Sequence, residues 1–121
     1  MQIKYTLLIV TMLMCGCAAS SVNELKTSPG YHKEVTVNYS YQEALKIIKD
    51  EYASMQGYDL SCTVYPDMKK GECTGTGAPG VFIFISTEFK TEKASNVNFY
   101  TAINNGTWRS NIDKIISKLN S

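Results

Sequence analysis

Four β-prone segments follow one another in this chain, separated only by short stretches rich in turn residues. They span 58–65, 72–76, 81–89 and 97–102. Strands joined by short loops pair antiparallel, because a parallel pair needs a long crossover connection. An alternation of apolar and polar residues over 35–40 predicts one more strand. The chain is therefore restricted to folds built on an antiparallel sheet.

Two amphipathic segments flank the four strands. The first has apolar residues at helical spacing over 41–56, begins with Ser40 and Glu43 in the positions of a capping box, and stops at Gly57. The second carries an apolar stripe along the C-terminal residues, with Thr107 as its candidate cap. One sheet face accepts both helices. The predicted fold class is therefore α+β, a two-layer sandwich with two helices on one face of an antiparallel sheet, in the order β-α-β-β-β-β-α.

The N-terminus, MQIKYTLLIVTMLMCGC, has an apolar run from Tyr5 to Met14 behind a positive charge. Such a run rises about 15 Å in a helix, half of a hydrocarbon core of about 30 Å, and so suits a signal peptide. Met14-Cys15-Gly16-Cys17 resembles the lipobox, the cleavage site of bacterial lipoproteins, with Gly16 as the small residue before the invariant cysteine. The alternatives are an ordinary secretory signal and a buried apolar strand.

The lipobox resemblance implies cleavage after Gly16, a diacylglycerol thioether on Cys17 and acylation of the new amine. Two or more acyl chains anchor a protein stably. Ala18 at the next position implies sorting to the outer membrane, on its periplasmic side. The segment after Cys17 is rich in Ser, Ala, Pro and Gly and suggests a flexible tether. The expected organisation is a signal peptide (1–16), a lipidated N-terminus and flexible tether (17–34), and a periplasmic α+β domain (35–121).

Two cysteines remain beyond the signal segment, Cys62 and Cys73. If residue 65 pairs with residue 70 across the turn, position 62 falls opposite position 73, within disulfide range. An oxidising compartment favours a disulfide, which should contribute about 2–3 kcal/mol. A redox pair and a metal site are the rivals. No CxxC motif is present.

Composition and motifs exclude several functions. With 12 Lys and Arg against 11 Asp and Glu, the chain has no basic surface for nucleic acid. The glycines of 75–80 match a dinucleotide fingerprint, but a strand follows them where a helix is required. The lone His32 lies in the expected tether, without metal-ligating neighbours. We expect no catalytic residues, no metal and no cofactor. Tyr31, Tyr58 and Tyr65 lie at segment edges, where exposed rings could bind a partner or a glycan.

The sequence thus predicts a non-catalytic lipoprotein, held to the membrane by its lipid anchor and binding an envelope protein. The alternative is a periplasmic inhibitor or immunity protein against a lytic enzyme or toxin, with the polar loops 66–71 and 90–96 entering a cleft. An enzyme is the third hypothesis, and it requires a concave pocket with convergent polar groups.

Overall fold

The structure is a computed structural model that describes residue 19 and residues 21–56, 60–77 and 80–121. The predicted signal peptide, its cleavage site at Gly16 and the lipidation position Cys17 lie outside the described residues, so all three stay predictions. In the part of the chain that is described, no helix is long and apolar enough to cross a membrane.

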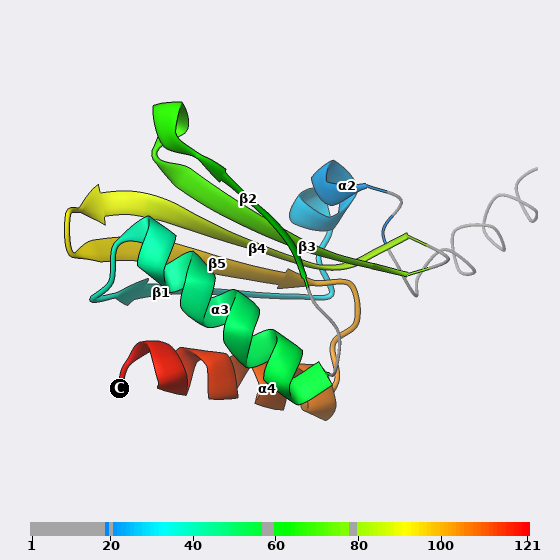
Figure 1. Ribbon diagram of the computed structural model, residues 1–121. Helices are drawn as coiled ribbons and strands as arrows, with labels where there is room; N and C mark the ends of the chain where they lie inside the picture. Colours follow the sequence, from blue (N-terminus) through cyan, green and yellow to red (C-terminus); the bar gives the residue numbers. More distant parts are fainter. Residues whose placement is uncertain (1–18, 20, 57–59, 78–79) are drawn as a thin grey trace, which may run out of the picture.

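Five antiparallel strands form one sheet in the order β1-β5-β4-β3-β2 (Figure 1). The strands are β1 (Tyr31–Val37), β2 (Ser61–Tyr65), β3 (Lys70–Gly77), β4 (Gly80–Thr91) and β5 (Ala94–Thr101). The chain crosses from β1 at one edge to β2 at the other, and returns strand by strand until β5 lies beside β1. The predicted α+β class and antiparallel sheet are confirmed. The glycine-rich segment joins two antiparallel strands, β3 and β4, as expected.

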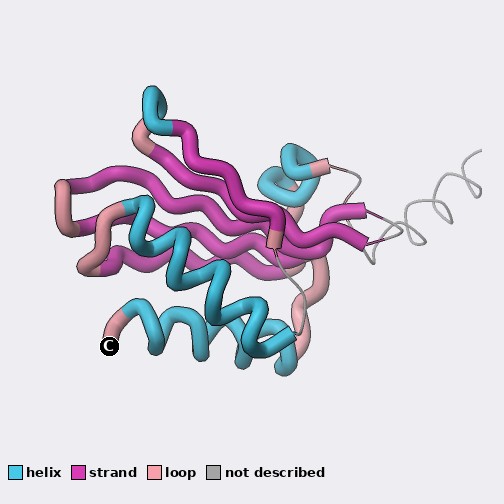
Figure 2. Tube along the Cα trace, in the orientation of Figure 1, coloured by secondary structure: helices cyan, strands magenta, loops and turns pink. Residues whose placement is uncertain are grey.

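Two long helices cover one face of this sheet (Figure 2). They are α3 (Tyr41–Gln56) and α4 (Gly106–Leu119). Between them and the sheet lies the main core, whose fully buried members include Ile48 and Tyr52 of α3, Ile85 and Phe99 of the sheet, and Ile112 of α4. The two helices lie on the same face, as the sequence predicts.

The two helix starts differ in how well the sequence predicts them. At α3, the Glu43 N–H donates to Ser40 Oγ at 3.2 Å, as the capping box requires. At α4, the cap is Asn105 rather than Thr107: Asn105 Oδ1 accepts a hydrogen bond from the Trp108 N–H at 3.0 Å. Asparagine is a stronger N-cap than threonine, so the helix begins two residues earlier than expected.

A third, short helix corrects the expected flexible tether over 17–34. Helix α2 (Val22–Thr27) lies on the other face of the sheet, and its Leu25 is fully buried in a small cluster with Val81 and Phe84 (Figure 1). Strand β1 also begins inside the expected tether. The folded region therefore starts well before residue 35, because Leu25 covers an end of β4 that is apolar on both faces.

Ala19, three residues before the first residue of α2, is fixed to the sheet as well. Ala19 and Val81 exchange two backbone hydrogen bonds, with N···O distances of 3.0 and 2.8 Å. Ala19 is itself buried. The first described residue is thus tied to the start of β4.

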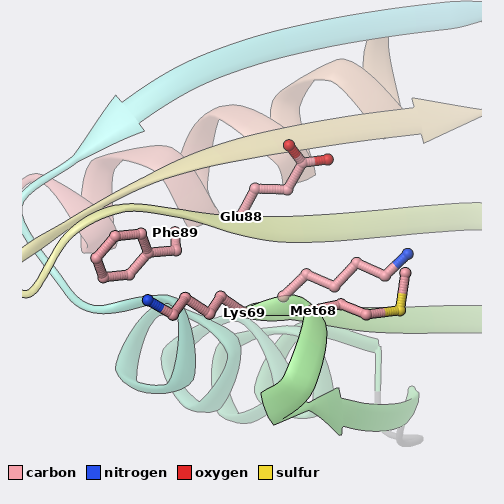
Figure 3. Close-up of a pocket in the computed structure, with 5 residues that line it drawn as sticks. Met68, Lys69, Glu88 and Phe89 are labelled. Atoms are coloured by element: carbon pink, nitrogen blue, oxygen red, sulfur yellow. The ribbon is translucent and has the colours of Figure 1, made fainter.

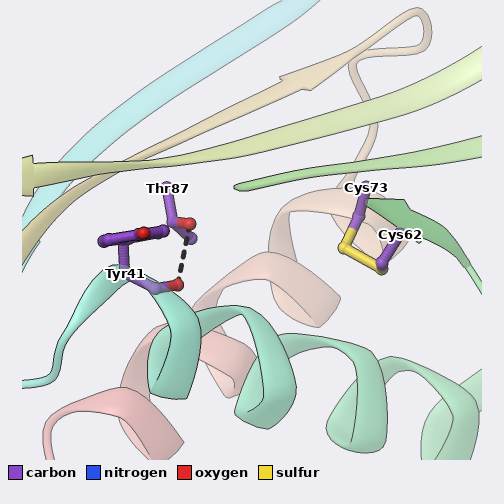
Figure 4. Close-up of a disulfide and its surroundings, with 4 residues drawn as sticks. All are labelled: Tyr41, Cys62, Cys73 and Thr87. Atoms are coloured by element: carbon purple, nitrogen blue, oxygen red, sulfur yellow. Dashed lines mark hydrogen bonds between the residues drawn. A yellow bond between two sulfur atoms is a disulfide. The ribbon is translucent and has the colours of Figure 1, made fainter. Parts of the chain in front are cut away.

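The predicted pairing of β2 with β3 is confirmed, and so is the disulfide. Residue 65 pairs with 70, and Cys62 lies opposite Cys73 with a Cα–Cα distance of 4.0 Å. Figure 4 shows the sulfur atoms below the sheet, on the side of α3, where Cys73 is fully buried. The same view shows the Thr87 hydroxyl donating to the Tyr41 carbonyl at 2.9 Å, which ties the first turn of α3 to β4.

Candidate functional site

The exposed large apolar side chains gather at one end of the sheet. Among the described residues these are Met68, 63% exposed, with Val64 and Phe89 at 40% and Tyr65 at 39%. Val64 and Tyr65 end β2, and Met68 belongs to the short 3-10 helix η2 (Pro66–Met68) that follows it. Phe89 lies near the end of β4. Since exposed apolar side chains that gather in one place mark interaction sites, this end is the candidate binding surface.

An open hollow of about 420 Å³ lies there, between the β2–β3 turn and β4. Its lining is Met68, Lys69, Lys70, Glu88 and Phe89, which we call the turn-end patch (Figure 3). Among these lining residues, none carries a hydroxyl, a thiol or an imidazole, so the patch offers apolar contact and charge for binding.

The backbone of the turn sets the position of the patch. Lys69 adopts a left-handed conformation with φ of 50°, uncommon outside glycine, and its N–H donates to the Pro66 carbonyl at 3.1 Å. The Lys69 carbonyl in turn accepts a hydrogen bond from the Phe89 N–H at 2.9 Å. These two bonds hold the turn against β4.

The lysines of the patch lie over aromatic rings. Lys69 Nζ is 4.6 Å from the centre of the Phe89 ring, with Met68 extending from the other side of the turn (Figure 3). Lys70 Nζ is 5.6 Å from the Tyr65 ring and 3.4 Å from a carboxylate oxygen of Glu72. Cation–π contacts at exposed sites contribute about 0.5–1 kcal/mol each. The patch therefore presents aromatic, thioether and cationic groups together.

The structure brings the two sequence-predicted loops to this same end. The turn at 66–71 includes η2, and the β4–β5 turn lies within 90–96, although it is shorter than expected because β5 already begins at Ala94. Phe89 belongs to the β-prone segment 81–89, which forms a central strand of the sheet. Strand β4 is buried from Ile83 through Thr87 and exposed from Glu88 onward, so Phe89 is exposed. The polar sequence that follows Thr87 was the signal for this change.

A second polar group lies on the sheet face opposite α3. His32 is part of β1, not a tether residue: its ring stacks on Tyr100 with 4.3 Å between centroids, and Nε2 hydrogen-bonds to Asn98 Oδ1 at 2.9 Å. Burial, followed by the negative charges of Glu34 and Glu88, raises the pKa of the Tyr100 hydroxyl above its ordinary value of 10.0. Within the described ranges, no His, Cys, Asp and Glu side chains cluster closely enough to hold a metal ion.

The sequence-predicted site residues have different outcomes. Cys62 and Cys73 form the expected disulfide. Of the three tyrosines at segment edges, Tyr65 is exposed, Tyr31 is partly buried against the core, and Tyr58 lies outside the described residues. Gly16 and Cys17 lie outside the described residues. No protein-family model matches the chain, and no curated protein is significantly similar to it.

Proposed function

We propose that this chain is a lipid-anchored envelope protein of the outer membrane, facing the periplasm, that binds a partner protein through the turn-end patch. The lipobox resemblance around Cys17 supports the anchor. The disulfide between Cys62 and Cys73 supports an oxidising compartment such as the periplasm, since such bonds are rare in the cytosol.

The observation that carries this proposal is the distance along β4 between the attachment point of Ala19 and the turn-end patch. Ala19, two residues after the proposed lipidation position, pairs with Val81 at the start of the strand. Phe89 lies eight residues further along the same strand, a distance of about 26 Å. Ala19, the described residue nearest to the proposed anchor, and the most exposed apolar surface therefore lie at opposite ends of β4, which supports a patch that is accessible to a partner.

An inhibitor or immunity protein is the second candidate, favoured by the position of the two turns. Both project from the same end of the sheet, and the hydrogen bond between Phe89 and Lys69 holds the first turn to β4. Two turns side by side on a rigid sheet suit insertion into the cleft of an enzyme. Deleting the gene and challenging the cells with lysozyme or a competitor's toxin tests this role. Unchanged survival removes it.

The anchor is tested by metabolic labelling with palmitate, followed by membrane fractionation. We expect label on the wild type and none on Cys17→Ser, which should leave the membrane fraction. Cys15→Ser is the matched control, because it removes a neighbouring thiol of the same motif and should keep the label. Equal labelling of wild type and Cys17→Ser contradicts the anchor.

The binding surface is tested with a photo-crosslinking amino acid at position 68 in intact cells. We expect one discrete adduct that weakens when Phe89→Ser is added. The control places the same amino acid at Ser54, an exposed position on α3. The same adduct from both positions, or no adduct from position 68, contradicts the turn-end patch as the binding surface.

A further inference from the structure

The two edges of the sheet are built differently. β1 contains Lys33 and Glu34, and Lys33 Nζ lies 3.7 Å from an Asp113 carboxylate oxygen of α4. Charges on an edge strand oppose pairing with another chain. β2 has the sequence SCTVY, with no charge and no proline, and four of its five residues are exposed. No described helix or strand lies along its outer side (Figure 1). β2 is therefore the unprotected edge.

The short distance between Cys62 and Cys73 shows which backbone groups of β2 face outward. Opposed residues in an antiparallel pair are about 4.5 Å apart at positions without mutual hydrogen bonds and about 5.5 Å apart at positions with them. The 4.0 Å Cα–Cα distance assigns Cys62 to the first kind. Since the two kinds alternate, the N–H and C=O groups of Cys62 and Val64 point to the free edge. The disulfide also holds this edge in place before any partner arrives.

We propose that two copies of the chain associate through β2, antiparallel and centred on Thr63, to form one continuous sheet with five strands from each copy. In this register Cys62 of each copy lies opposite Val64 of the other, and all their outward backbone groups pair in four hydrogen bonds. Thr63 lies opposite Thr63, a favourable cross-strand pair, and Ser61 lies opposite Tyr65. No like charges meet.

The neighbouring registers are poorer. A pair centred on Val64 places Cys62 opposite Pro66, which has no N–H to donate. A pair centred on Cys62 places Val64 opposite Leu60, which precedes the strand and is buried in the core. In the register centred on Thr63, β2 of a second copy therefore satisfies every outward backbone group of Cys62 and Val64, and the neighbouring registers do not.

The two-fold axis of this pairing is perpendicular to the sheet. Such an axis keeps the two α2 helices on the same face of the joined sheet. It also reverses the strand direction in the second copy, so the two Ala19 residues lie at opposite ends of the dimer. The self-association does not depend on the proposed lipid anchor.

Cysteine trapping tests the register in membranes from cells that produce the full chain. We expect Thr63→Cys to give a reducible dimer on a non-reducing gel, severalfold more than the wild type, because the two Thr63 Cα atoms should lie about 4.5 Å apart. Thr36→Cys is the matched control, an exposed threonine on the other edge strand. Equal trapping from both positions, or none from position 63, overturns the proposal.

Charged residues introduced at position 63 give a second, independent measurement of self-association. Thr63→Lys and Thr63→Glu should each weaken self-association by about tenfold or more, measured by sedimentation of the purified full chain in detergent, because like charges meet at the centre of the pair. Mixing the two variants should restore a dimer. Circular dichroism checks that both fold, as expected at an exposed position. A dimer that persists in Thr63→Lys, or a wild type that is monomeric throughout, overturns the proposal.

Discussion

Reduction of the Cys62–Cys73 disulfide should lower the free energy of unfolding by about 3 kcal/mol. The bond joins residues 11 apart, so the closed loop has about a dozen residues, and the loss of loop-closure entropy in the unfolded chain gives this value at 25 °C. For a domain of this size, such a loss lowers Tm by about 10 °C or more. The native contacts change little, since both thiols remain at their positions in the sheet.

Urea unfolding with and without a phosphine reductant, followed by circular dichroism, measures the difference. The m-value should rise on reduction, because the unfolded chain then exposes more surface. The variant Cys62→Ala/Cys73→Ala is the control and should not respond to the reductant. A difference below about 1 kcal/mol would show that the β2–β3 hairpin persists in the unfolded chain, and would refute the loop-closure argument.

Three further predictions concern α2, the start of α4 and the hydroxyl group of Tyr100. Leu25→Ala should cost about 2–4 kcal/mol of stability in urea, because Leu25 is fully buried; a change within 0.5 kcal/mol would show that α2 does not hold to the sheet. Asn105→Ala should cost about 1 kcal/mol and Thr107→Ala much less, and the reverse order would restore Thr107 as the cap. Spectrophotometric titration, as the difference between wild type and Tyr100→Phe, should show Tyr100 ionising above pH 10.0, and Glu34→Gln should move this step down. Since the pKa is raised in the folded state, this group stabilises the fold only below its folded pKa, and the stabilisation is lost as pH rises through that value.

The strand pattern predicted much of the fold because its signals are local. The bounds of α3 follow from its capping residues and apolar spacing, and the pairing of residue 65 with 70 follows from the turn. The sequence did not predict helix α2, because the helix is short and depends on packing of Leu25 against Phe84, which is distant in the sequence. Ser21 and Glu24 stand at capping-box spacing and were its one local signal: Ser21 Oγ accepts from the Glu24 N–H at 3.1 Å.

The turn-end patch was predicted only in part. Both loops were expected to be exposed, but their meeting at one end depends on strand order, which no local pattern contains. Phe89 has the residue type of a buried strand position, and only its place beyond the last residue that the helices cover leaves it exposed. The predicted tether shows the opposite error: its composition is polar, yet its last residues form the start of β1 at the edge of the sheet.

Two backbone hydrogen bonds to Val81 tie Ala19 to the sheet two residues after Cys17. If Cys17 carries lipid, at most about 7 Å of chain separates that residue from Ala19, against roughly 55–60 Å for the flexible tether that the composition suggested. The folded domain of such a protein would stay close to the bilayer surface, because the short connection could not extend it far into the periplasm. Any molecule that it recognises must then come to the membrane surface.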